Sequence, residues 1–141
     1  MFKKAGTIGV TIDFDSEEEK LDIEIGNVSI LASRLTPNEV NSFIFVYLEP
    51  GKKQKQQTSI RKGTKEPVFN ETITFQKITT DELMKTTLKI KVINQGKLKN
   101  NNKLGEVGIS LSSINIRNKE IFNTELFIQR TEVSFIVDIF S

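Results

Sequence analysis

The sequence contains no cysteine, no histidine and no tryptophan, and only one tyrosine. Without cysteine there are no disulfides, which agrees with a reducing compartment. Cysteine and histidine are also the commonest transition-metal ligands, so their absence argues against zinc, copper and iron–sulfur sites. The same absence excludes catalysis by a histidine acid–base or a cysteine nucleophile.

Long apolar runs and catalytic motifs are missing as well. No stretch is long enough for a transmembrane helix, and Met1 to Lys4 lead into no apolar segment of signal-peptide length. Neither Ser-x-x-Lys, Gly-x-Ser-x-Gly nor a phosphate-cradling glycine loop is present. The nearest paired carboxylates, Glu17 to Glu19 and Asp81-Glu82, fall in predicted turns. We therefore expect no enzymatic activity and no cofactor.

The composition is that of one globular domain. The 141 residues are 37% hydrophobic and include ten phenylalanines, so we expect a single domain over residues 1–141. The net charge of +2 is too small to indicate nucleic-acid binding, and few aromatics interleave with the basic segments. The charges are segregated, with an acidic cluster from Asp13 to Glu19 and basic segments at Lys52–Lys65 and Lys85–Lys103.

Alternation with a period of two predicts strands along most of the chain. A loop is predicted at Arg34–Asn41, a helical turn at Asp81–Lys85 capped by Thr80 or Asp81, and a polar loop at Lys97–Lys103. About eight short strands with little helix indicate an all-β antiparallel sandwich or barrel. The predicted strands lie around Ile8–Ile12, Leu21–Leu31, Phe43–Leu48, Gln54–Lys62, Val68–Phe75, Leu88–Val92, Val107–Leu111 and Val133–Ile139.

Several ordered segments resemble a C2 domain of the synaptotagmin type. Tyr47-Leu48-Glu49-Pro50 precedes a lysine-rich hairpin, and Glu66 to Phe75 is similar to the family's asparagine-centred signature, departing at Glu66 and Ile73. Leu88 to Val92 and Gly105-Glu106 match later segments. The resemblance implies an eight-stranded antiparallel Greek-key β-sandwich, with three loops at one end that meet calcium and lipid in many relatives.

The resemblance also tests for a metal site. Calcium needs several hard oxygen ligands, mainly carboxylates. The positions of the aspartates in calcium-binding relatives carry no acid here, so we expect a divergent member with no bound metal. These degenerate positions are Leu35, Asn41, Asn94, Gly96 and Asn102.

Basic residues of the hairpin and of a later strand form the main candidate site. They lie together if the two strands are neighbours, and such a surface attracts anionic phospholipids, phosphoinositides or an acidic protein. The alternative is that they are solvated or guard an exposed edge. Phe43, Phe45 and Gln57 replace polar residues of the selective headgroup pocket of some relatives, which favours diffuse attraction. The candidates are Lys52, Lys53, Lys55, Arg61, Lys89 and Lys91.

A second candidate is Lys97-Leu98-Lys99, where an apolar residue between lysines resembles a membrane-docking loop. The sequence thus predicts a monomeric, calcium-independent module that binds anionic membranes or an acidic partner in membrane targeting or vesicle trafficking. It would lie on the cytoplasmic side of membranes as a peripheral protein. The alternative is a protein–protein interaction scaffold that never binds lipid.

Overall fold

Within its described residues, the chain forms eight antiparallel strands and four short helical turns. The computed structural model describes residues 2–114 and 119–129. The helical turns are η1 (Pro37–Glu39), α1 (Thr80–Leu83), η2 (Lys97–Lys99) and η3 (Leu111–Ser113). The strands are β1 (Phe2–Asp15), β2 (Lys20–Ile30), β3 (Ser42–Glu49), β4 (Lys53–Gln57), β5 (Val68–Phe75), β6 (Thr87–Gln95), β7 (Asn101–Ser110) and β8 (Glu120–Gln129).

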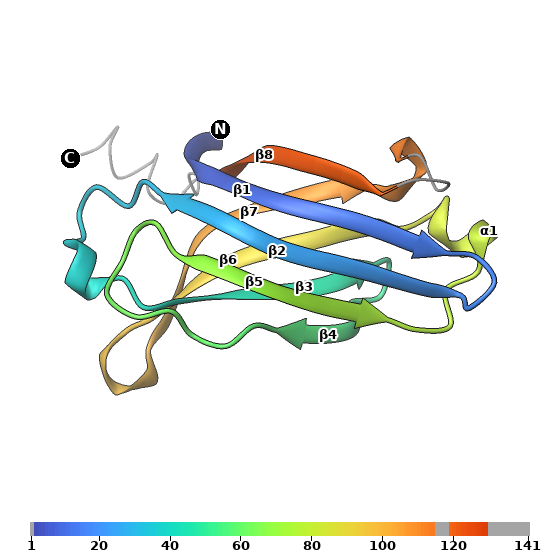
Figure 1. Ribbon diagram of the computed structural model, residues 1–141. Coiled ribbons are helices and arrows are strands. Elements are labelled where there is room, and N and C mark those ends of the chain that lie inside the picture. Colours follow the sequence, from blue (N-terminus) through green and yellow to red (C-terminus); the bar gives the residue numbers. More distant parts are fainter. Residues whose placement is uncertain (1, 115–118, 130–141) are drawn as a thin grey trace.

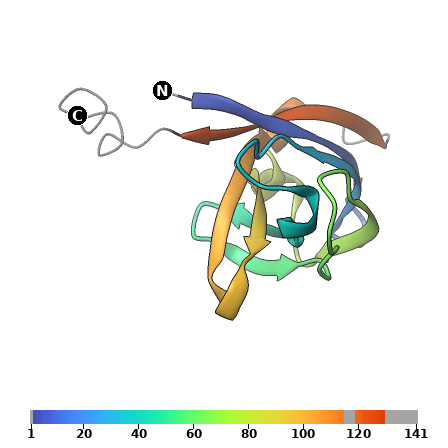
Figure 2. The same ribbon diagram turned by 90° about the vertical axis from the view of Figure 1, so that its left-hand side faces the viewer.

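The strands make two sheets that face each other as a sandwich. The hydrogen-bonded order is β4-β3-β6-β7-β8-β1-β2-β5, and a single residue pair, Glu106 with Phe127, joins β7 to β8. The chain therefore folds into one sheet of β4, β3, β6 and β7 and a second of β8, β1, β2 and β5. Figures 1 and 2 show the two layers. The predicted eight-stranded antiparallel sandwich is confirmed.

The core lies between the sheets and is made by the predicted alternation. Ile8, Val10 and Ile12 of β1 are buried, as are Leu88 and Ile90 of β6. The residues between them point away from the core and are only half-buried. Burying an aliphatic side chain stabilises a fold by about 1.5–3 kcal/mol, so this pattern holds the strands in register.

Asn70, at the centre of the family-like signature, has a conformational role. Its φ of 49° is left-handed, a region that asparagine tolerates better than most residues. It stands where the pairing of β2 with β5 shifts between Ile25 and Asn27. The signature therefore marks an irregularity in the edge strand of the second sheet.

Several predicted boundaries are wrong. The strand predicted at Gln54–Lys62 ends at Gln57, the loop predicted up to Lys103 is already strand from Asn101, and Leu111 belongs to η3. The helical turn is capped by Thr79, whose side chain accepts from the N–H of Glu82. Strand β8 is missing from the prediction. The strand predicted at Val133–Ile139 lies outside the described residues.

Candidate functional site

The outer face of the first sheet carries two aromatic residues of β3. Phe45 and Tyr47 pack edge to face, with ring centroids 5.5 Å apart and planes at 62°. Tyr47 is only 3% exposed although it is outside the core cluster, so neighbouring side chains on the outer face cover it. This aromatic pair is the platform on which the nearby lysines lie.

Two predicted lysines meet over the Tyr47 ring. The Nζ atoms of Lys52 and Lys91 lie 5.7 and 5.3 Å from the ring centroid. A cation over an aromatic face gains about 0.5–1 kcal/mol at exposed sites. Lys52 comes from the β3–β4 turn, where Gly51 and Lys52 both have positive φ, and Lys91 comes from β6. The contact brings together groups from two separate segments.

The strand arrangement differs from the prediction in one respect. The hairpin strand β4 and the strand β6 are not neighbours, because β3 lies between them. In register, Lys91 stands opposite Phe45 and Lys89 opposite Tyr47. Lys52 and Lys91 are therefore linked across Tyr47 of β3. We call Lys52, Lys53, Lys55, Lys89 and Lys91 the basic face.

Acidic partners occupy only part of the basic face. Lys89 Nζ lies 3.7 Å from Glu106, which also accepts from Lys103. In the described part of the chain, Lys52, Lys53, Lys55 and Lys91 form no ion pair, and the three hairpin lysines are exposed. Four positive charges of the basic face thus remain without an ion pair among the described residues.

Glu106 is held ionised by its surroundings. Its partial burial raises the pKa, but the hydrogen bond from Lys103 and the charges of Lys103, Lys89 and Lys91 outweigh burial and lower the pKa below its ordinary value. Its charge therefore persists at neutral pH and offsets part of the positive field of β6.

Arg61 does not join the lysines. Its Nε and one terminal nitrogen donate to the carbonyls of Val68 and Phe69 at 3.1 and 2.7 Å, and it pairs with Glu71 at 2.9 Å. The guanidinium lies 5.0 Å from the Phe69 ring centroid. A strand continuing to Lys62 would place Arg61 on the same face as the hairpin lysines. Strand β4 ends at Gln57, and the chain then turns toward β5, so Arg61 points elsewhere. Arg61 ties the two sheets together at their edge.

A second feature is an open hollow of about 730 Å³ at one end of the sandwich, which we call the loop hollow. The three connections that carry η1, Lys62 and η2 form it. The five residues that the resemblance predicts as degenerate calcium positions all line it. Its lining residues are Leu35, Asn38, Glu39, Asn41, Lys62, Asn94, Gln95, Gly96, Lys97, Asn100 and Asn102.

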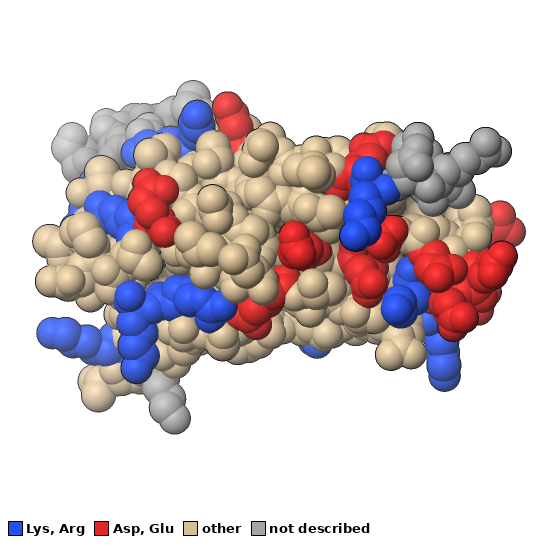
Figure 3. Space-filling model, viewed as in Figure 1, with Lys and Arg blue, Asp and Glu red and all other residues tan. Residues whose placement is uncertain are grey.

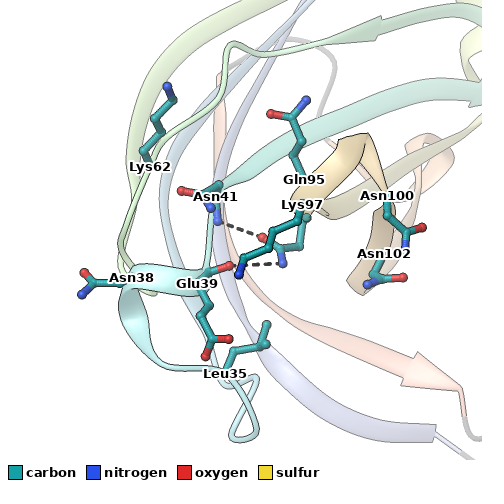
Figure 4. A pocket seen from close by; sticks show the side chains of 11 residues that line it. Leu35, Asn38, Glu39, Asn41, Lys62, Gln95, Lys97, Asn100 and Asn102 are labelled. Atoms are coloured by element: carbon teal, nitrogen blue, oxygen red, sulfur yellow. Dashed lines mark hydrogen bonds between the residues drawn. The ribbon is translucent and has the colours of Figure 1, made fainter.

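Asn94 holds the floor of the loop hollow. It is 5% exposed, its Oδ1 accepts from the N–H of Asn41 at 2.8 Å, and its Nδ2 donates to the carbonyl of Glu39 at 3.4 Å. Asn41 in turn accepts from the N–H of Gly63 at 3.1 Å. Figure 4 shows Asn94's two bonds as dashed lines. Amide groups thus bridge the connections at Asn41 and Asn94.

Glu39 is the one acid among the described residues that line the loop hollow. Its carboxylate accepts from the N–H and the hydroxyl of Thr36 at 2.9 and 3.0 Å, which caps η1. These two bonds, with smaller contributions from Lys97 and Lys65, lower its pKa. Within the described residues, no group of three or more His, Cys, Asp or Glu could hold a metal ion.

The β6–β7 connection carries the second predicted candidate. Leu98 is 100% exposed and has φ 59°, and Figures 1 and 2 show this connection protruding from the sandwich. Lys97 is exposed and extends toward Glu39 and Asn41 (Figure 4). Lys99 belongs to the same turn. The turn presents an apolar side chain beside a lysine.

Charge is also divided along the sandwich. Figure 3 shows Lys and Arg gathered at the left-hand end, where the β2–β3 and β6–β7 connections lie, and Asp and Glu gathered at the right-hand end around the β1–β2 turn. In the described residues, no helix is long and apolar enough to cross a membrane.

Comparison with known proteins decides the family. The family model described as "C2 domain" matches residues 15–126. This chain belongs to the C2 domain family. The C2 domain is similar to a solved structure, the third C2 domain of KIAA1228 protein, with 25% identity and a TM-score of 0.75 over 86% of this chain and 87% of that one.

Curated relatives agree with this assignment. The C2 domain is 26% identical to synaptotagmin 1 of Drosophila melanogaster over 81% of this chain and 24% of that protein. It is 32% identical to human "C2 calcium-dependent domain-containing protein 4C" over 77% of this chain and 26% of that protein. The chain thus spans about a quarter of the length of these relatives.

Sequence reasoning missed three residues of these sites. Lys62 and Glu39 line the loop hollow, but they lie in irregular connections where periodicity carries no signal. In the sequence, Glu106 stands out only as part of the Gly105-Glu106 match. In this C2 domain it is the partner of Lys89.

Proposed function

We propose that this C2 domain binds anionic phospholipid membranes without calcium, through the basic face. The observation that supports the proposal is the meeting of Lys52 and Lys91 over Tyr47, on a surface where four lysines form no ion pair in the described residues. A protein of this kind would act in membrane targeting or vesicle trafficking, as a peripheral monomer on the cytoplasmic side of membranes.

The expected affinity follows from electrostatics. Each Lys or Arg near an anionic membrane contributes about 1 kcal/mol, so four unpaired lysines give about 4 kcal/mol, roughly a thousandfold in partitioning. The Debye length is about 10 Å at 0.1 M salt, so binding weakens steeply as salt rises. The attraction is diffuse, because Phe45 and Gln57 stand on this face in place of polar headgroup ligands.

Calcium independence rests on the chemistry of the loop hollow. A calcium site takes six to eight oxygens and gains most from carboxylates. Here the single lining carboxylate of the described residues, Glu39, is already bonded to Thr36. The other side-chain oxygens are neutral amides, and Lys62 and Lys97 add positive charge. The hollow therefore suits a divalent cation poorly.

A second candidate function is a scaffold for an acidic protein, with no lipid binding. The same four lysines would then meet carboxylates of a partner. The two functions differ in their response to a bare lipid surface, because only the first needs no partner protein.

Vesicle co-sedimentation tests the proposal. Vesicles with phosphatidylserine, with a phosphoinositide or with neutral lipid alone are compared in calcium and in chelator, at low and high salt. We expect binding to both anionic vesicles, equal with and without calcium, that is lost at high salt. Calcium-dependent binding would contradict the reasoning on the loop hollow, and no binding at low salt would favour the scaffold.

Matched variants locate the surface. Lys52→Glu with Lys91→Glu should weaken vesicle binding at least about tenfold, since two attractions of about 1 kcal/mol become repulsions. The control is Lys3→Glu with Lys119→Glu, two exposed lysines on the side of β1 and β8. If both pairs lower binding equally, net charge and not the basic face accounts for the affinity.

A further inference from the structure

The loop hollow is large enough for a small ligand and is lined mainly by basic and amide side chains. Its volume of about 730 Å³ falls within the range of about 300–1,000 Å³ typical of small-molecule sites. Among its described lining residues are two lysines, Lys62 and Lys97, and one carboxylate, Glu39. Lys65 also lies close enough to lower the pKa of Glu39. The local charge is positive.

The one carboxylate among the described lining residues, that of Glu39, is already hydrogen-bonded. Glu39 receives the N–H and hydroxyl of Thr36 and caps the short helix η1. Lowering of its pKa by these bonds means that it stays ionised and bonded at neutral pH. It therefore neutralises at most one of the ammonium groups around the hollow, and a positive charge remains for a ligand.

Amide side chains around the hollow supply further donors. Asn94 and the Oδ1 of Asn41 are used between the connections. Asn38, Gln95, Asn100 and Asn102 have exposed or half-buried side chains that line the hollow and form no hydrogen bond within the described residues. Phosphate oxygens accept hydrogen bonds from ammonium and amide N–H groups, and this hollow presents both kinds of donor.

The backbone at Gly96 leaves no room for a side chain. A Cβ added at Gly96 would meet the carbonyl oxygen of Asn100 at 2.7 Å, closer than real Cβ contacts allow. The N–H of Gly96 donates to that same carbonyl at 2.9 Å, which closes the turn. An aspartate at this position would displace the β6–β7 connection. The turn as it stands therefore excludes a carboxylate ligand at position 96.

We propose that the loop hollow binds a phosphate group, held by the ammonium groups of Lys97 and Lys62. Figure 4 shows Lys97 reaching across the hollow toward Asn41 and Glu39, with Lys62 on the rim beyond Asn41 and Asn100 and Asn102 on the opposite side. The ammonium of Lys97 lies among the residues that line the hollow, and its charge favours an anion there. The proposal goes beyond the basic face and does not depend on it.

Titration with inorganic phosphate, followed by ¹⁵N NMR, tests the proposal. We expect shifts of the Gly63 and Gly96 backbone amides and of the asparagine side-chain amides of the hollow, beyond those caused by chloride at equal ionic strength. Lys62→Ala with Lys97→Ala should weaken this binding at least tenfold while the rest of the spectrum is unchanged. Lys77→Ala with Lys85→Ala, two exposed lysines far from the hollow, should leave it unaltered.

Two further measurements separate this proposal from the membrane proposal and distinguish a lipid phosphate from a soluble one. Lys52→Glu with Lys91→Glu should leave the phosphate titration intact even where vesicle binding is lost. Vesicles that display phosphomonoester headgroups should lose at least tenfold in affinity with the Lys62 and Lys97 variant if the phosphate is that of a lipid; retained affinity assigns the hollow to soluble phosphate. Absent phosphate shifts, or shifts that survive the Lys62 and Lys97 variant, would overturn the site.

Discussion

Lys52 and Lys91, from the β3–β4 turn and from β6, place their ammonium groups over the same ring, that of Tyr47. Each ammonium group is attracted by the electron-rich face of the ring. The arrangement covers Tyr47, which is nearly buried although it lies outside the core. The basic face is therefore part of the stability of the sheet as well as a charged surface.

This relationship predicts different effects of two substitutions at Tyr47. Tyr47→Leu removes the ring, its packing with Phe45 and both cation contacts, so it should lower the free energy of unfolding by about 2–3 kcal/mol. Tyr47→Phe keeps the ring and should cost less than about 1 kcal/mol. Urea unfolding measures both. Equal losses for the two variants would show that the ring face holds neither lysine.

Arg61 should behave as a structural residue. Arg61→Ala leaves two carbonyls of β5 and the half-buried carboxylate of Glu71 without their partner, so we expect a loss of about 2–3 kcal/mol in the free energy of unfolding. Vesicle binding of the folded variant should change by less than about threefold. Lys55→Ala is the control, with little effect on stability. A large loss of vesicle binding in Arg61→Ala would return Arg61 to the binding surface.

Glu106 connects stability with binding. Because its pKa is lower in the folded state, its carboxylate stabilises the fold above its ordinary pKa of 4.5, and this contribution is lost as pH falls through that value and below. The unfolding free energy of Glu106→Gln should thus be lower than that of the native chain at pH 7, and the difference should shrink toward pH 3. A difference that does not vary with pH would contradict this.

The same substitution should strengthen vesicle binding at neutral pH. Glu106→Gln removes the acid that pairs with Lys89, so one more lysine meets the anionic lipid, worth about 1 kcal/mol or roughly fivefold. Glu125→Gln, which removes an acid of β8 paired with Lys4 of β1, serves as the control. Equal gains for the two variants would assign the effect to net charge.

Much of the fold could be predicted because burial alternates locally. Ile8 to Ile12 and Leu88 to Val92 show which side of each strand faces the core, whatever their neighbours are. Strand β8 escaped prediction because adjacent Ile121 and Phe122 break the alternation, and Ile121 is largely exposed. Its pairing with β1 depends on residues more than a hundred positions away.

The candidate site was predictable only in part, for the same physical reason. The five degenerate positions meet in one hollow because the connections of a sandwich converge at its end. Strand order is not local, so nothing in the sequence places β3 between β4 and β6. Partners such as Glu71 for Arg61 and Glu106 for Lys89 depend on that order. Which charges of a surface remain unpaired can therefore be learned only from the structure.

Gly6 should be sensitive to any side chain. Its φ is 148°, and an added Cβ would lie 1.9 Å from the carbonyl oxygen of Ser29 on β2, so β1 and β2 would have to separate. Gly6→Ala should destabilise the fold by more than about 3 kcal/mol. Gly63→Ala is the control: its φ of 68° costs only about 1 kcal/mol, because nothing lies within 4 Å. Similar losses by urea unfolding would argue against this close approach of β1 and β2.

Leu98 tests whether the protruding turn adds apolar contact to charge attraction. Leu98→Asn should leave the free energy of unfolding unchanged or slightly raised, because the side chain is fully exposed and asparagine tolerates the left-handed φ of 59°. If the turn dips into the bilayer, the variant should lose affinity for anionic vesicles by about tenfold or more, since burying a leucine contributes about 1.5–3 kcal/mol. That loss should persist at high salt, unlike the effect of the lysines. Unchanged affinity at every salt concentration would confine membrane contact to the basic face.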